Sequence, residues 1–179
     1  MDTNFNHTLS QLLVSEAVRE LEKRFDNMPD KSTHVETHIQ ELGKKPGFAM
    51  ASQLCRSFGD IDSQAAMVKF ITNHFSPSVF GVNPKVDISS STLVIKFGSN
   101  LPSWFYCIAT RDPNSLTAQQ IHWFKAYANF IAGVYCGALT HFGYKAVPVI
   151  NPCTPSNLQI TFTLTEFTGT WEFAASMQH

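Results

Sequence analysis

The fold is decided by one stretch of the chain, Phe130-Ile-Ala-Gly133-Val-Tyr-Cys-Gly137-Ala-Leu139, which runs on to a turn glycine at Gly143. Gly133 and Gly137 are four positions apart, so they share one face of a helix. Each glycine costs a helix about 1 kcal/mol relative to alanine. The pair therefore predicts that another backbone or a large ring packs closely against this face. Helix dimers in membranes use the same spacing, but the apolar run from Tyr127 to Leu139 is too short to cross a bilayer.

This stretch belongs to a long helix with clear start and stop signals. Thr117 can cap its first turn, and the helix is expected to reach Phe142, where Gly143 ends it. The segments around it are rich in β-branched and aromatic residues and are bounded by Ser, Gly, Pro and Asn, as strands are. The expected strands are Thr92–Phe97, Trp104–Ala109, Tyr144–Ile150 and Asn157–Leu164, with Val79–Val86 as a weaker candidate.

The first part of the chain has helical periodicity. An opening helix is expected over Thr8–Phe25 and ends at the Asp26–Asp30 turn, which contains Pro29. Its helically spaced residues are Leu9, Leu12, Leu13, Glu16, Ala17 and Leu21.

A second helix is expected from Ser32 or Thr33, where Thr33 and Glu36 can form a capping box. The helically spaced apolar residues of this second helix are Val35, Ile39 and Leu42. Pro46 is expected to break or kink it before Phe48–Phe58 resumes the helix. A third helix is expected over Ser63–Phe75, capped by Asp62 and limited by Pro77.

The order of elements is helices, strands, one long helix and strands, without βαβ alternation. This order predicts an α+β fold with helices packed on an antiparallel sheet. We expect a disordered N-terminus over residues 1–7, a single domain over 8–165 and a C-terminal tail over 166–179.

Composition and charge argue against several classes of partner. Of the 179 residues, 44% are hydrophobic and only 15% are charged, with a net charge of −1. The weak charge argues against nucleic acid and against an anionic membrane surface as partners. The apolar surplus predicts a buried partner face and a protein that does not stay monomeric. The N-terminus lacks a signal-peptide pattern, and the four cysteines form no CxxC pair, so we expect reduced thiols and a cytoplasmic location.

The chemical motifs argue against an enzyme. His34 and His38 share a helix face, but Val35 holds the position after the first His where a zinc protease carries Glu. Cys136 and His141 are poorly aligned for a nucleophile and its base. Phosphate-binding and dinucleotide-binding glycine motifs are missing from the sequence. We therefore expect no catalytic residue, no metal and no cofactor.

The stretch from Gly133 to Gly143 resembles the last-helix signature of the small subunits of TRAPP, the transport protein particle. Leu12-Leu13-Val14-Ser15-Glu16-Ala17-Val18 is similar to the opening-helix pattern of that family, and Gly47-Phe48-Ala49-Met50-Ala51-Ser52-Gln53-Leu54 to its second-helix pattern. The resemblance covers about residues 8–165. Ala49 and Ala51 replace the usual Arg and Gly of the second helix. The acyl-binding subunit of the family carries a cysteine near the position of Gly59 to Ile61, where this chain has none.

The resemblance implies an α/β plait that pairs with other TRAPP small subunits through its first two helices, as an architectural subunit rather than the acyl-binding one. The implied complex tethers vesicles between the endoplasmic reticulum and the Golgi apparatus and promotes nucleotide exchange on Rab GTPases, which this chain would meet only indirectly. Contact with membranes would be peripheral. The expected interface residues are Leu9, Leu12, Leu13, Glu16, Phe48, Met50 and Leu54.

Two other functions stay open on the sequence. Fifteen Phe and a glycine-spaced helix could line a pocket for an acyl chain or another apolar ligand. A small hydrolase or a metal protein is the weaker alternative.

Overall fold

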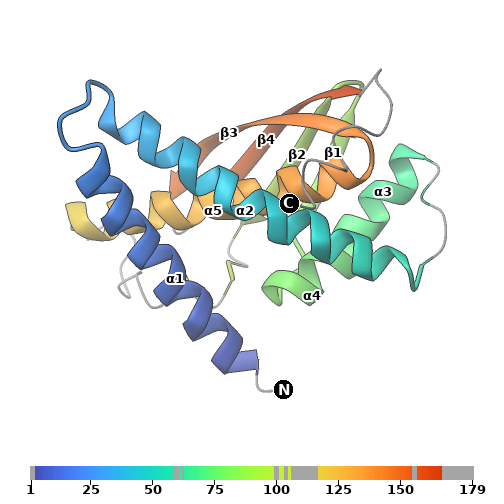
Figure 1. Cartoon of the computed structure of the whole chain (residues 1–179). Helices are drawn as coiled ribbons and strands as arrows, with labels where there is room; N and C mark the ends of the chain where they lie inside the picture. Colours follow the sequence, from blue (N-terminus) through green and yellow to red (C-terminus); the bar gives the residue numbers. More distant parts are fainter. Residues whose placement is uncertain are drawn as a thin grey trace.

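The computed structural model describes residues 3–58, 61, 63–98, 101–102, 105, 117–154 and 157–166, with side chains from residue 12 onward except that of residue 152. Helices come first, then a hairpin, a long helix and a second hairpin (Figure 1). The elements are α1 (Thr3–Arg24), α2 (Lys31–Cys55), α3 (Gln64–Phe70), a π-helical turn η1 (Ile71–Phe75), α4 (Ser76–Phe80), β1 (Lys85–Ser89), β2 (Thr92–Gly98), α5 (Ala118–His141), β3 (Tyr144–Thr154) and β4 (Asn157–Glu166).

The described strands form one four-stranded antiparallel sheet in the order β1-β2-β4-β3. Along β4 the side chains alternate, with Leu158, Ile160, Phe162 and Leu164 buried and the residues between them more open. This alternation is the pattern of a sheet that is covered on one face. The predicted α+β fold with helices on an antiparallel sheet is confirmed.

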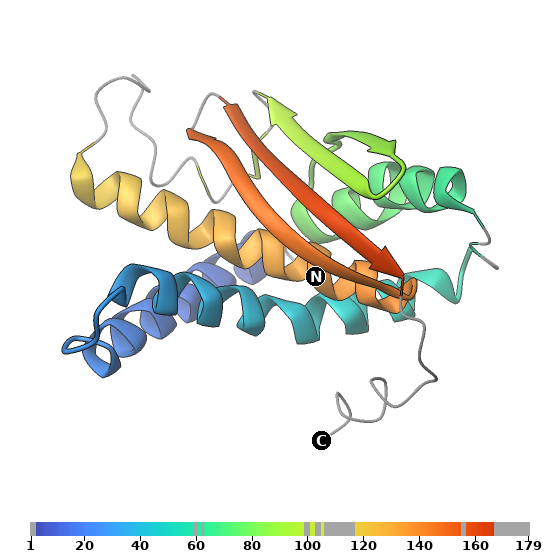
Figure 2. The same ribbon diagram turned by 90° about the horizontal axis from the view of Figure 1, so that it is seen from above.

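Helix α5 forms the middle layer of the molecule. It lies between the sheet and α2 (Figure 2). Every residue from Ile131 to Leu139 is buried, which explains why this segment lacks a polar face. The predicted limits of the helix are confirmed: Thr117 and Gln120 form a capping box, and Gly143 follows the helix with φ 83°.

The core between α5 and the sheet is filled with aromatic rings around Tyr135. This side chain is fully buried, and its hydroxyl shares a hydrogen bond of 2.8 Å with the buried Ser76 hydroxyl. The rings of Phe75, Phe80 and Phe162 lie 5.7, 5.3 and 6.2 Å from its ring. The buried polar atom is therefore satisfied within a densely packed aromatic cluster.

Several predicted boundaries were wrong. Helix α1 begins at Thr3 rather than Thr8. The capping box at Thr33 does not form, because α2 begins at Lys31 with Asp30 as its N-cap residue. The third helix is capped by Ser63 and, after the π-helical turn, continues as α4 past Pro77, which occupies the first turn of that helix where a missing N–H is tolerated.

The weak strand prediction for Val79–Val86 was wrong for most of its length. The segment begins inside α4, which ends at Gly81 with φ 72°, and only its last two residues belong to β1. Predictions for Asp62, Trp104, Cys107 and the tail beyond Glu166 lie outside the described residues.

Candidate functional site

The inner face of α1 holds this helix against α5. Val14 and Val18, one turn apart, are 4% and 0% exposed. Between them, the Ser15 hydroxyl shares a hydrogen bond of 2.9 Å with the Tyr127 hydroxyl of α5. These contacts define which side of α1 faces the core.

The outer face of α1 carries two large apolar side chains. Leu12 and Leu13 are each 63% exposed. At 100° per residue, Leu12 lies about 160° around the helix from Val14, and Leu13 about 100°. With this exposure, neither leucine belongs to the hydrophobic core of this chain. The side chain of Leu9 lies outside the described residues.

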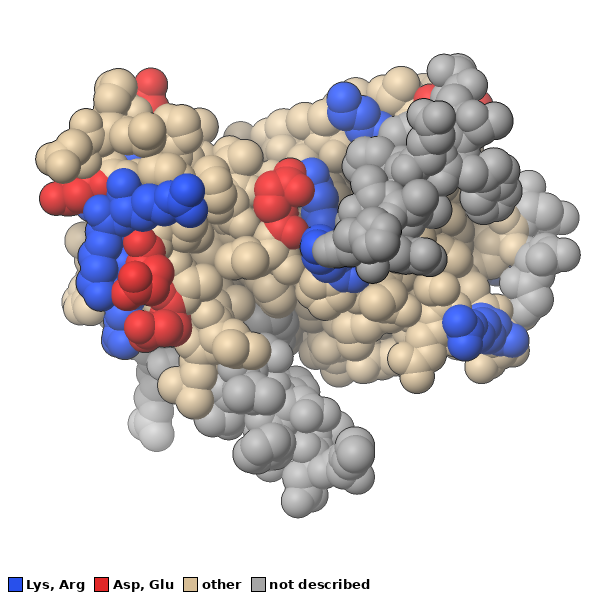
Figure 3. All heavy atoms as spheres, in the orientation of Figure 1, with Lys and Arg blue, Asp and Glu red and all other residues tan. Residues whose placement is uncertain are grey.

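The character of this outer face changes along the helix. Glu16 pairs with Arg19 at 3.4 Å, and Glu20 pairs with Lys23 at 2.7 Å, all at exposed positions. Figure 3 shows the side of the molecule on which α1 lies. On this side the charged side chains gather over α1 and at a few other places, and broad uncharged surface separates these groups. Among the described side chains, the outer face of α1 thus carries two exposed leucines followed by ion-paired residues. Glu16 stands at the boundary between the two.

Helix α2 presents a second exposed ridge. Leu42, Pro46 and Ala49 follow one another at intervals of four and three residues and are all exposed, Leu42 by 50%. Such spacing places them on one face of the helix. The ridge is therefore apolar in its side chains.

The expected interface residues of α2 lie closer to the core than this ridge. Met50 and Leu54 are half-buried and pack against the hydrophobic core. Phe48 is also half-buried, with its ring 5.4 Å from the His141 ring in an edge contact. Leu42 was expected on one stripe with Val35 and Ile39, but those two residues are buried and Leu42 is exposed.

Gly133 and Gly137 lie against the backbone of α2. A Cβ atom at Gly137 would come within 2.7 Å of the Phe48 nitrogen, and one at Gly43 within 2.8 Å of the Val134 nitrogen. The two helices therefore cross with glycines on both sides, as Gly43 and Gly47 of α2 face the glycines of α5. Beside the crossing, the Gln40 amide donates a hydrogen bond of 2.7 Å to buried Asn129.

His34 and His38, which were considered as metal ligands, both pack against the ring of Phe25. The ring of His34 stacks on Phe25 with centroids 5.3 Å apart, and that of His38 lies 4.8 Å from Phe25. Nδ1 of His38 donates to the carbonyl of His34 at 2.8 Å. In the described part of the chain, no three His, Cys, Asp or Glu side chains gather in an arrangement that could hold a metal ion.

The described cysteines are poorly ionised. Burial raises the pKa of Cys136 to about 12 and that of Cys153 to about 11, and it also raises the pKa of Cys55. A thiol is nucleophilic as the thiolate, so these three groups are weak nucleophiles at neutral pH.

Comparison with known proteins identifies the family. The family described as "Transport protein particle (TRAPP) component" matches residues 10–164, and the chain belongs to this family. It therefore has a role in a TRAPP complex, with other TRAPP subunits as its partners in vesicle transport. No protein of curated function matches the sequence.

A solved structure supports the fold. A trafficking protein particle complex subunit 3 from Naegleria fowleri, covalently bound to palmitic acid, superposes with a TM-score of 0.63 at 18% identity, covering 91% of this chain and 99% of that one. An H-NOX protein from S. oneidensis reaches only 0.47 at 14% identity, covering 83% of this chain and 72% of its own, and carries no weight. Among the described residues, no helix is both long and apolar enough to span a membrane.

Proposed function

We propose that this chain is an architectural subunit of a TRAPP complex, and that it pairs with a second TRAPP small subunit through the outer faces of α1 and α2. The observation that carries the proposal is the position of Leu12, Leu13 and Leu42. These leucines are half exposed or more on helices whose other faces already contact the core. Exposed apolar side chains rimmed by ion pairs are typical of a partner surface.

The assembled complex would act in vesicle tethering between the endoplasmic reticulum and the Golgi apparatus and in Rab nucleotide exchange. This subunit would hold its neighbours in place without chemistry of its own, in the cytoplasm and peripheral to the membrane. The family membership supports this role in outline.

An acyl-binding role is the second candidate, because the Naegleria subunit carries palmitic acid. The structure of this chain favours it less. Tyr135 and its neighbouring rings occupy the core between α5 and the sheet. Burial also disfavours the thiolates that would have to be acylated. An intact mass equal to that of the unmodified chain, measured on protein purified from its native cell, is the expected result.

Affinity purification from the native cell tests the pairing. The tagged chain should recover other TRAPP small subunits in near-stoichiometric amount. Leu12→Glu and Leu42→Glu should each reduce that recovery at least tenfold, since a carboxylate buried in an apolar interface without a counter-charge is strongly disfavoured. Gln119→Glu, at an exposed position of α5, is the matched control. Unchanged recovery with folded Leu12→Glu and Leu42→Glu proteins would reject this surface.

A further inference from the structure

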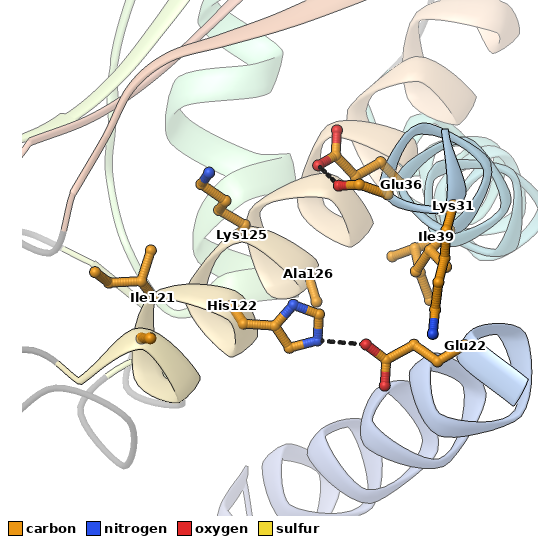
Figure 4. A pocket seen from close by; sticks show the side chains of 11 residues that line it. Glu22, Lys31, Glu36, Ile39, Ile121, His122, Lys125 and Ala126 are labelled. Carbon is orange, nitrogen blue, oxygen red and sulfur yellow. Dashed lines mark hydrogen bonds and ion pairs between the residues drawn. The ribbon is translucent and has the colours of Figure 1, made fainter. Parts of the chain in front are cut away.

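A groove of about 480 Å³ lies where the ends of α1, α2 and α5 meet (Figure 4). Its lining includes the carboxylates of Glu22 and Glu36 and the ammonium groups of Lys31 and Lys125. Glu22 already lies 3.1 Å from Nε2 of His122. Because charges of both signs line the groove, it selects no one class of ligand. The free edge of the sheet has a more definite character.

Strand β3 forms one edge of the described sheet, beside β4, and β1 forms the other (Figure 2). The two edges differ in length and in side chains. Strand β1 has five residues, and its Asp87 lies 3.5 Å from Nζ of Lys96 on β2. Strand β3 has eleven residues, and its outer face carries Val147 and Val149, which are 54% and 58% exposed. A long edge strand with exposed apolar side chains is a template for pairing with another chain.

The hydrogen bonds of β4 determine which backbone groups of β3 face this edge. The Leu164 N–H donates to the Ser91 carbonyl at 2.7 Å, so Leu164 is bonded toward β2. Successive residues of a strand direct their N–H and C=O groups to opposite sides. Thr163 is therefore bonded toward β3, where it lies opposite Val147. It follows that Val147 and every second residue from it along β3 are bonded to β4.

The residues between these, Ala146, Pro148 and Ile150, direct their backbone groups to the free edge. Pro148 has no N–H, so the middle of the edge lacks a donor. The Ala146 carbonyl accepts from the Cys136 thiol of α5 at 3.5 Å, so one acceptor of the edge is already engaged. A strand added here would leave hydrogen-bonding groups of its own without partners.

The segment around Pro148 otherwise has the composition of a strand that pairs between chains. Ala146-Val147-Pro148-Val149-Ile150 carries no charge, and three of its five residues are β-branched. Segments with high β propensity, low charge and no proline pair readily with copies of themselves. Pro148 is the residue of this segment that departs from the pattern.

From this geometry we propose that Pro148 closes the β3 edge, so that a second copy of this chain cannot pair its own β3 with it. An added strand would lie about 4.8 Å away and would meet the pyrrolidine ring where it needs a donor. This role concerns the sheet and goes beyond the pairing through α1 and α2.

Amide hydrogen exchange on the full chain, resolved by residue with nuclear magnetic resonance, tests the geometry. In the wild-type chain the amides of Val147 and Val149 should exchange about tenfold or more slowly than those of Ala146 and Ile150, because only the first two are bonded within the sheet. Pro148→Val restores the edge donor. Each regained hydrogen bond strengthens association by about fivefold, and a symmetric antiparallel pair gains two, so association through β3 should tighten by about 25-fold. The amides of Ala146 and Ile150 in this variant should then become protected as the protein concentration rises.

Val149→Thr is the matched control, because it changes an exposed position of the same strand without adding an edge donor. Pro148→Ala restores the same donor with a smaller side chain and gives the result if Pro148→Val does not fold. Protection of Ala146 and Ile150 in the dilute wild-type chain, or a folded Pro148 variant in which both amides stay unprotected at high concentration, would overturn the proposal. Because protection is read at β3, self-association through α1 and α2 does not affect the result, and the two proposals can fail separately.

Discussion

Adding one methyl group at Gly137 should force the α2–α5 crossing apart. A Cβ atom there would lie 2.7 Å from the Phe48 nitrogen and closer still to the Lys44 carbonyl oxygen, whereas ordinary contact begins at 3.4 Å. Both atoms belong to the α2 backbone, so no side chain can rotate away and the whole helix must shift. Gly137→Ala therefore tests whether the glycine face is structurally required.

The magnitude follows from two opposed terms. Overpacking of a core costs about 1–3 kcal/mol or more, and backbone contacts place this site at the upper end. The alanine returns about 1 kcal/mol through its higher helix propensity. The expected net loss is about 2 kcal/mol, which lowers the melting temperature by about 4–8 °C in a chain of this size. Gly137→Leu should lose more.

Thermal and urea unfolding followed by circular dichroism measure this loss. Gln119→Ala is the matched control, since the residue is exposed on the same helix and should change the free energy of unfolding by less than about 0.5 kcal/mol. An unchanged or raised melting temperature for Gly137→Ala would refute the account of the crossing.

Three further predictions concern ionisation and assembly. Burial lowers the pKa of His141, so the unfolded state binds more protons and the free energy of unfolding should fall as the pH drops below about 6.5. His141→Gln should flatten this dependence in urea titrations at pH 7.5 and 5.5. Cys136 should react with iodoacetamide at pH 8 only after unfolding, and rapid labelling of this cysteine in the native protein, located by peptide mass mapping, would contradict its burial. The purified chain without a partner should show a weight-average mass above 20.0 kDa that rises with concentration in sedimentation equilibrium, and a constant 20.0 kDa would exclude self-association.

The long helix and the second hairpin could be predicted because their signals are local. Thr117 and Gln120 form the cap that the sequence pattern indicates, and Gly143 supplies the left-handed conformation after the helix. The strands that flank α5 have β-branched residues and alternating burial, which a sequence pattern records directly.

The course of α2 could not be predicted, because tertiary packing overrides its local signals. Pro46 predicts a break or a kink, and the break is wrong, since the helix runs from Lys31 to Cys55. Gly43 and Gly47 hold it along α5, so that packing offsets the cost of the proline. A stripe at every fourth residue, through Val35, Ile39, Gly43 and Gly47, would have identified the buried face.

Leu42 was misassigned for the same reason. Leu42 fits the helical period of Val35 and Ile39, but the buried face of α2 continues through Gly43 and Gly47. Because glycine has no side chain, a pattern of hydrophobic residues does not include these two positions. For the candidate site, the sequence indicated Leu12 and Leu13 through their adjacency, because two neighbouring residues cannot both point into one narrow contact.

Hydrogen exchange on the free chain and on the purified TRAPP complex tests the central claim most directly. If a second subunit covers the outer faces of α1 and α2, the backbone amides of residues 9–16 and 42–53 should exchange at least tenfold more slowly in the complex, while those of β3 should not change. Equal exchange of both helix segments in the two states, with protection at the sheet instead, would contradict the proposed pairing surface.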